Sequence, residues 1–321
     1  MTIGVAASGP NAGAAVRAAV LGAELLGRGA IGGFAVYGML DEQHRVTHRV
    51  TQRGGVTSLN LPESWLKAQC AAAISSGPDR PEPLEQFLPG IDGVGLVTGH
   101  RLPNSPDGNG VPVNQAVLAH IAAGNSPQGA VDAVLDANPG IDAGLIALAA
   151  DGRLGFGDVR RVRTRADYGR CSRDNGRSRI ALVHNSIYSH VPLAEILVDL
   201  AWSCLTGGPT AARFLYVRKA LPIRASDRDR IHVTEKGEIV AVDSANPSLP
   251  FANRRTTAIY LGSQVWQDGR HVGEVLTELI TEVVNGVVRR PNAEGASLII
   301  MRNFQHSPES ADVDAARKIG P

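Results

Sequence analysis

A loop rich in polar side chains follows the apolar run at 93–97. Its members that could bind or activate a substrate are Thr98, His100, Arg101, Asn104 and Asp107. Histidine ionises near neutral pH and can act as a general base, and a guanidinium can grip a carboxylate or imide oxygen. We therefore expect His100 to be a base that Asp107 orients, Arg101 and Asn104 to bind substrate, and Thr98 to be a candidate nucleophile. Turn formers alone would also explain much of this loop.

A second polar group, HNSIYSH, occupies 184–190 after another apolar run. His184 is an alternative base, and Asn185 and Tyr188 are candidate substrate-binding residues. The structural alternative is that Asn185 or Ser189 caps the following helix. His184 and His190 with a carboxylate could ligate a metal, but no tight ligand motif accompanies them. The sequence therefore predicts neither a metal site nor a cofactor.

A third polar stretch, NRRTT at 253–257, precedes an apolar run near the end of the chain. Arg254 is the candidate here, because a guanidinium suits an anionic substrate. The alternative is an exposed loop with solvated charges.

These polar groups lie between elements typical of an α/β protein. Short apolar runs predict strands at 2–8, 93–98 and 180–186 and a hairpin at 142–158, while helical patterns occur at 10–27, 111–121, 127–137, 192–205 and about 272–288. Ser126 followed by Pro127 has the form of a helix start. Ligand groups collect where strands hand over to loops, so the loops at 98–109 and 184–190 are placed to share a pocket.

The domain organisation is expected to be one α/β domain over 1–306 with a flexible tail at 307–321. The order of apolar and turn residues is similar in 14–46 and 129–155, which leaves open a duplicated half. In that case halves 1–158 and 180–306 would be joined by an arginine-rich segment at 159–179.

The composition limits the classes of partner that we expect this chain to bind. The chain has 321 residues, is 43% hydrophobic and carries a net charge of +1, which gives no general attraction to nucleic acid or an anionic membrane. It shows neither a signal-like start nor an apolar run long enough for a membrane span. Three separated cysteines favour the cytoplasm. The arginine-rich segment 159–179 has no aromatic side chain besides Tyr168 and no recognised binding motif, so we expect subunit contacts in a homo-oligomer and no nucleic-acid binding.

Residues 116–158, AVLAHIAAGNSPQGAVDAVLDANPGIDAGLIALAADGRLGFGD, carry a family resemblance. The helix, the G-x-S-P-x-x-A corner, a second helix ending in NP and a strand–DGR–strand hairpin resemble Ntn-hydrolase-like families, most closely a poorly characterised bacterial branch. The resemblance implies a layered αββα sandwich and hydrolysis of amides by an N-terminal nucleophile. Thr2 is the residue that matches this role, and removal of Met1 would free its α-amine to act as base.

The function predicted from the sequence is hydrolysis of an amide or other C–N bond of a small polar or anionic molecule. The alternative is a non-catalytic ligand-binding or assembly protein on a degenerate Ntn-like fold. Because Met1 precedes Thr2 in the chain, the alternative stays open. The concentration of histidine and asparagine after two strands favours the enzyme.

Overall fold

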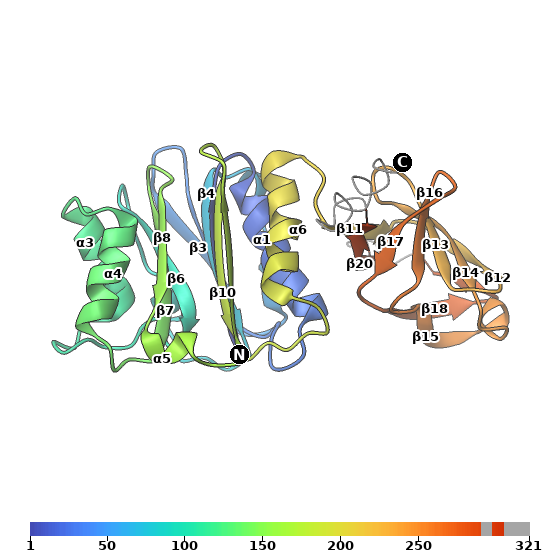
Figure 1. The fold of residues 1–321 in the computed structure, drawn as a ribbon, viewed down its shortest axis with the longest axis horizontal. Helices are drawn as coiled ribbons and strands as arrows, with labels where there is room; N and C mark the ends of the chain where they lie inside the picture. The colour runs from blue at the N-terminus through green and yellow to red at the C-terminus, as the bar shows by residue number, and fades with distance from the viewer. Residues whose placement is uncertain (290–296, 305–321) are drawn as a thin grey trace, which may run out of the picture. The chain divides into compact units, whose positions relative to one another are not determined.

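The computed structural model describes residues 1–289 and 297–304, and it divides into two compact units, Met1–Gly208 and Pro209–Pro321 (Figure 1). A single domain over 1–306 was expected, whereas the chain contacts separate two compact units after Gly208. The boundary lies just after Gly207, the residue that ends the helix Leu193–Thr206. The backbone of Gly207 is in the left-handed conformation. The expected tail at 307–321 lies outside the described residues.

The first unit contains a six-stranded antiparallel sheet in the order β3-β2-β4-β1-β10-β9. Its strands are β1 (Thr2–Ser8), β2 (Ala35–Leu40), β3 (Val46–Thr51), β4 (Cys70–Ser76), β9 (Tyr168–Asp174) and β10 (Arg179–Asn185). β1 is buried along its length because it lies inside the sheet, between β4 and β10. Its pairing sets Thr2 opposite Ser76 on one side and opposite Asn185 on the other.

Two helices, α1 (Ala12–Leu26) and α6 (Leu193–Thr206), cover one face of this sheet (Figure 1). They pack on each other, α1 against β1 and β4 and α6 against β9 and β10. α1 buries mostly alanine, valine and leucine. Alanine is the best helix former, and its small side chain lets the two helices approach closely. Both effects explain why α1 is rich in alanine.

A second sheet has the order β5-β6-β7-β8, with β5 (Gly90–Ile91), β6 (Gly95–Arg101), β7 (Ala143–Ala149) and β8 (Leu154–Asp158). Helices α3 (Val113–Ala122) and α4 (Pro127–Ala137) pack on it. The Ser126 hydroxyl accepts the Gly129 N–H and Pro127 is the first helical residue, so the helix start predicted there is confirmed.

The two sheets face each other across an apolar core that includes Ala6, Ile74, Leu96, Ile146 and Val183. Near one end the backbones nearly touch, because a Cβ atom on Gly4 would lie 2.3 Å from the Gly99 carbonyl oxygen. Helices α1 and α6 contact the six-stranded sheet, and α3 and α4 contact the four-stranded sheet (Figure 1). The predicted mixed α/β class is confirmed.

The arginine-rich segment does not join two halves. Residues 159–179 form the short helix α5 (Arg160–Arg163), the strand β9 and the turn into β10, all inside the first unit. The short elements α2 (Glu63–Leu66), η1 (Gly55–Leu59) and η2 (Leu84–Phe87) complete this unit.

The second unit consists of strands in the order β11-β20-β17-β16-β13-β14-β12-β19-β18-β15. They are β11 (Ala212–Val217), β12 (Leu221–Ala225), β13 (Arg230–Val233), β14 (Ile239–Ser244), β15 (Arg254–Ile259), β16 (Gln264–Gln267), β17 (Arg270–Val275), β18 (Leu279–Val284), β19 (Val287–Val288) and β20 (Ser297–Asn303), with the short helix η3 (Leu249–Phe251). Its described residues hold no α-helix, so 180–306 is not a second copy of the helix-covered sheets.

The helix predicted at about 272–288 is therefore wrong. β17, β18 and β19 occupy these residues. The segment is rich in valine, isoleucine and threonine, which favour strands, and Asn285 and Gly286 both have positive φ in the turn between β18 and β19. An Asn-Gly pair between apolar runs is a strong hairpin signal, and it outweighs the apparent helical spacing.

Candidate active site

Polar side chains gather at the end of the gap between the two sheets where β1 begins. β1 is antiparallel to β4 and β10, so its first residue meets their last ones. Thr2 exposes 5% of its surface, and its hydroxyl oxygen lies 3.4 Å from that of Ser76. β6 ends near this point too, since the charge of Arg101, its last residue, is one of the causes that lower the pKa of the Met1 amino group.

Met1 covers Thr2 and is itself held by polar contacts. The Ser76 hydroxyl donates to the Met1 carbonyl oxygen and accepts a hydrogen bond from Arg80 Nη2 at 2.6 Å. The Met1 sulfur accepts the Ala30 N–H at 2.7 Å. Burial, and then the positive charges of Arg80 and Arg101, lower the pKa of the Met1 α-amino group. An amine at this end of the sheet is thus biased toward its neutral, basic form.

Arg101 provides a fixed guanidinium. Its backbone has φ 64°, a left-handed conformation at the last position of β6. Nε and Nη2 donate to the two carboxylate oxygens of Asp142 at 2.6 and 2.7 Å, and this ion pair holds the pKa of Asp142 below its usual range. Nη1 is buried and has no hydrogen-bond partner. A buried unpaired donor is costly, so this atom is available for a bound oxygen.

Asn185 lies beside Thr2 in a short chain of hydrogen bonds. Its Nδ2 donates to Ser186 Oγ at 3.2 Å, and the Ser186 hydroxyl donates to Asp167. That hydrogen bond and the ion pair with Arg165, at 3.1 Å, lower the pKa of Asp167. The Asn185 Oδ1 is buried without a partner. The side chain is held at one end and offers an acceptor at the other.

His100 is fully buried and hydrogen-bonded. Its Nε2 lies 2.7 Å from Asp158 Oδ1, and the Tyr168 hydroxyl donates to Asp158 Oδ2 at 2.5 Å. Burial, reinforced by the bond to Asp158, raises the pKa of Tyr168. His100 and Asp158 belong to β6 and β8 of one sheet, and Tyr168 belongs to β9 of the other. Their hydrogen bonds therefore link the two sheets. This arrangement suits a positioning role and leaves His100 no access to solvent.

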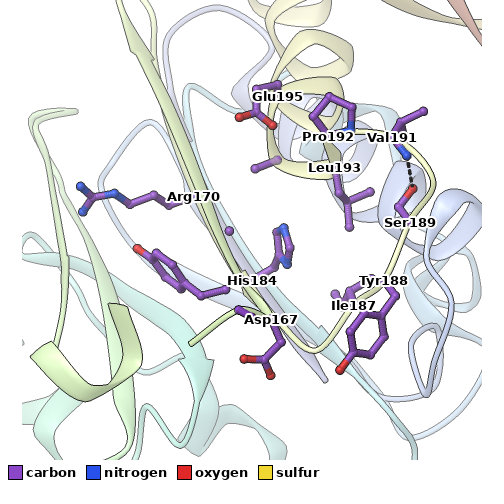
Figure 2. Close-up of a pocket in the computed structure, with 14 residues that line it drawn as sticks. Asp167, Arg170, His184, Ile187, Tyr188, Ser189, Val191, Pro192, Leu193 and Glu195 are labelled. Carbon is purple, nitrogen blue, oxygen red and sulfur yellow. Dashed lines mark hydrogen bonds between the residues drawn. The ribbon is translucent and has the colours of Figure 1, made fainter. Parts of the chain in front are cut away.

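His184 lies on the other face of the sheet. Side chains alternate along a strand, and Ala181 and Val183 of β10 face the gap between the sheets; Asn185 shares their face and His184 does not. His184 lines a cavity of about 460 Å³ together with Tyr188, which is 61% exposed (Figure 2). Burial and then the nearby His100 lower the pKa of His184 to about 4.

The remaining predicted residues have structural partners. Thr98 donates its hydroxyl to the Ala73 carbonyl at 3.0 Å and is fully buried, and Asn104 donates to Gln86 at 2.8 Å. Asp107 does not orient a histidine, since its carboxylate accepts the N–H groups of Asn109 and Val111 within the turn. Arg254 belongs to β15 of the second unit.

The sequence reasoning missed Ser76, Arg80, Asp142, Asp158 and Asp167. Asp158 and Ser76 are the last residues of β8 and β4, so the strand-end rule used for 98–109 would have found them. Arg80 follows β4 and Asp167 directly precedes β9, in segments that the sequence patterns did not single out. Asp158 fills the place expected of Asp107, because it is the carboxylate that contacts His100.

Within residues 1–289 and 297–304, no three His, Cys, Asp or Glu side chains are grouped as a metal ion would require. Over the same residues no helix combines the length and the apolar character needed to cross a membrane.

Comparisons with known proteins place the chain by family. No curated protein matches it. Among solved structures it is similar to the glutamine phosphoribosylpyrophosphate (PRPP) amidotransferase from B. subtilis complexed with ADP and GMP, with 9% identity and a TM-score of 0.32 over 57% of this chain and 41% of that one. The chain thus covers less than half of that protein. Residues 220–295 match a second model, Domain of unknown function (DUF7259). Residues 2–214 match the model described as Domain of unknown function (DUF6963), and the chain belongs to that family.

Proposed function

We propose that the protein hydrolyses an amide or other C–N bond of a small anionic molecule, with Thr2 as an N-terminal nucleophile once Met1 is removed. The observation that carries the proposal is the position of Thr2 at the start of the central strand, among Ser76, Asn185 and Arg101 at the mouth of the gap between the sheets. The order of layers supports an Ntn-type αββα sandwich for the first unit, as the sequence resemblance implies.

In this proposal the free α-amine of Thr2 takes the proton of the Thr2 hydroxyl, and the oxygen attacks the carbonyl carbon of the substrate. The C–N bond then breaks, and the leaving amine takes that proton from the α-ammonium group. Water hydrolyses the resulting ester, which releases the acid and restores the Thr2 hydroxyl. The amine must be neutral to act. Burial and the charges of Arg80 and Arg101, which lower the pKa of the amino group now on Met1, would act on the amine of Thr2 in the same direction. The unpartnered Asn185 Oδ1 is an acceptor that can orient this amine.

The negative charge that develops on the carbonyl oxygen needs a donor. Two are already present: the Ser76 hydroxyl, which donates to the Met1 carbonyl next to Thr2, and Arg101 Nη1, which is buried without a partner. Donors fixed before the reaction stabilise such charge most effectively. The ion pair with Asp142 holds the guanidinium in place. His100 and Asp158 support the site as positioning residues.

The substrate is proposed to be anionic because Arg80 and Arg101 both act on the same end of the sheet. Arg101 is partly neutralised by Asp142, whereas Arg80 makes its side-chain hydrogen bond to a neutral hydroxyl. A carboxylate beside the scissile amide would complement that charge.

The test is an intact-mass measurement of the purified protein followed by incubation with a panel of small carboxylate-bearing amides. The expected result is loss of Met1 together with release of amine or ammonia. Retained Met1 on all molecules, or Met1 loss with no turnover and no acylation of Thr2 by a β-lactone, would overturn the proposal.

One observation favours a second candidate, a non-catalytic ligand-binding protein. Met1 is packed on the site through its sulfur and its carbonyl oxygen, and a chain that retained it would have no free amine at Thr2. Retained Met1 would favour this non-catalytic protein, and if Met1 is lost, the turnover and acylation measurements decide between the two.

A further inference from the structure

The cavity beside His184 lies outside the proposed active site. It has a volume of about 460 Å³ and is formed by the start of β9, the end of β10 and the loop that leads into α6 (Figure 2). Its walls combine apolar and polar groups: Ile187, Val191 and Leu193 on one side, and Asp167, Arg170 and Glu195 around it. That volume suits a small organic molecule.

The first turn of α6 lines this cavity. The residue that precedes the helix is Pro192, whose side chain makes no capping hydrogen bond. The first hydrogen bond within the helix is donated by the Ile196 N–H to the Pro192 carbonyl. The N–H groups of the three residues between them, 193–195, therefore have no acceptor within the helix. Such groups carry the positive end of the helix dipole and bind anions.

His184 supplies an independent observation. It exposes 7% of its surface, and its Nδ1 is buried without a hydrogen-bond partner. The ring stands out from β10 toward the loop before α6 (Figure 2). Nε2 lies against Gly169, where a Cβ atom would come within 2.2 Å of it. Glycine at this position therefore leaves room at the imidazole nitrogen, although its backbone conformation does not require glycine.

The charges around the cavity leave room for an anion. Asp167 is engaged by Ser186 and by Arg165, so its charge is compensated. Arg170 and Glu195, which carry opposite charges, also line the cavity. Tyr188, largely exposed, offers an aromatic face at the rim. An anion with an apolar body would match the helix end, the imidazole and the apolar wall together.

We propose that this cavity is a second ligand site, which binds a small organic carboxylate between the first turn of α6 and the imidazole of His184. It differs from the proposed catalytic site, because Thr2 faces the gap between the sheets and His184 faces α6. The two sites are connected through Asn185, Ser186 and Asp167, the hydrogen-bonded chain that starts beside Thr2 and ends in the cavity wall. The proposal does not depend on catalysis.

The test follows the imidazole signals of the full chain, labelled in its histidines, by NMR during titration with phenylacetate and, separately, inorganic phosphate. A bound anion favours the imidazolium, so we expect a saturable shift of the His184 signal and a rise in its pKa. A response to phenylacetate alone identifies an organic carboxylate. A response of equal strength to phosphate, or none to either, would overturn the proposal.

Two variants and a control make the result specific. His184→Gln removes the imidazole, and Gly169→Ala closes the space at Nε2; each is expected to weaken phenylacetate binding at least about tenfold. His190→Gln changes an exposed histidine of the same loop that does not line the cavity and should bind normally. Because Gly169→Ala keeps His184, it serves even if His184→Gln folds poorly. Unchanged affinity in the folded Gly169→Ala protein would contradict the proposed site.

Discussion

The hydroxyl oxygens of Thr2 and Ser76 lie 3.4 Å apart across the β1–β4 pair. The same Ser76 hydroxyl donates to the Met1 carbonyl oxygen. A residue positioned to polarise a carbonyl therefore lies beside the candidate nucleophile, and this geometry follows directly from the strand register.

The first prediction concerns the nucleophile. Thr2→Ala should reduce labelling of the protein by a β-lactone at least about a thousandfold, because loss of a nucleophile removes the covalent step. Thr2→Ser keeps a hydroxyl and should remain reactive. The measurement is the mass of the adduct and of the N-terminal peptide. Thr57→Ala, at an exposed threonine of the first unit, is the matched control, and equal labelling of both alanine variants would rule out Thr2.

The second prediction concerns the charge of Arg80. Burial and then Arg80 are the leading causes that lower the pKa of the amino group at this site. A base must be unprotonated, so reactivity should rise with pH through the pKa of the amine. Arg80→Gln removes a positive charge and raises that pKa, which should move the acid limb of β-lactone labelling to higher pH by roughly 0.5–1 unit.

Arg53→Gln is the control for this second prediction. Arg53 is exposed and paired with Asp79 at 2.7 Å, and it is not among the causes that act on the amine. Its pH profile should match that of the unmodified protein. An acid limb that stays in place in Arg80→Gln would show that Arg80 does not tune the amine.

The sequence predicted that the ends of separate strands lie close together, and for two of the predicted loops they do. Arg101 and Asn185 end β6 and β10 at the same end of the unit where Thr2 begins β1. The partners of His100 and Thr98 could not be inferred, because they come from distant segments: Asp158, 58 residues away, for His100, and Ala73 for Thr98. Such pairs are set by how the sheets stack. Asp107 differs, because its carboxylate is engaged within its own turn.

The sequence did not predict that the second unit is separate, and the reason is different. Its strands pair mostly over long distances, such as β11 with β20, and its valine-rich segments match either period over a short window. The boundary between Gly208 and Pro209 comes directly after the end of α6. Glycine and proline residues end a helix in the same way whether a loop or a new unit comes next, so they do not mark a boundary between units.

The third prediction concerns the buried link between the sheets. Asp158→Ala leaves His100 and the Tyr168 hydroxyl unpaired at once and should lower the free energy of unfolding by roughly 3–5 kcal/mol. Tyr168→Phe removes a single hydrogen bond and should cost about 1–2 kcal/mol. Denaturant unfolding measures both. A variant Asp158→Ala as stable as Tyr168→Phe would show that the contact between His100 and Asp158 contributes little.

The fourth prediction concerns Glu24 of α1, behind the sheet. Burial raises its pKa from 4.5 to about 7, although the Val56 N–H and the Ser75 hydroxyl donate to it. A carboxyl group whose pKa is higher in the folded state stabilises the fold when protonated, and that contribution is lost as the pH rises from its unfolded pKa through its folded pKa. The free energy of unfolding should therefore fall by about 1–3 kcal/mol between pH 5 and pH 8.

Glu24→Gln tests this fourth prediction. Glutamine keeps the side-chain oxygen that accepts from Val56 and Ser75 but cannot ionise, so its stability should change less over the same pH range, with the gap in its favour widest at the alkaline end. Glu63→Gln is the matched control, because Glu63 lies in an exposed ion pair with Lys67 that lowers the pKa of its carboxyl group and should leave the slope between pH 5 and pH 8 unchanged. A Glu24→Gln protein with the same slope as the unmodified chain would assign the pH dependence to another group.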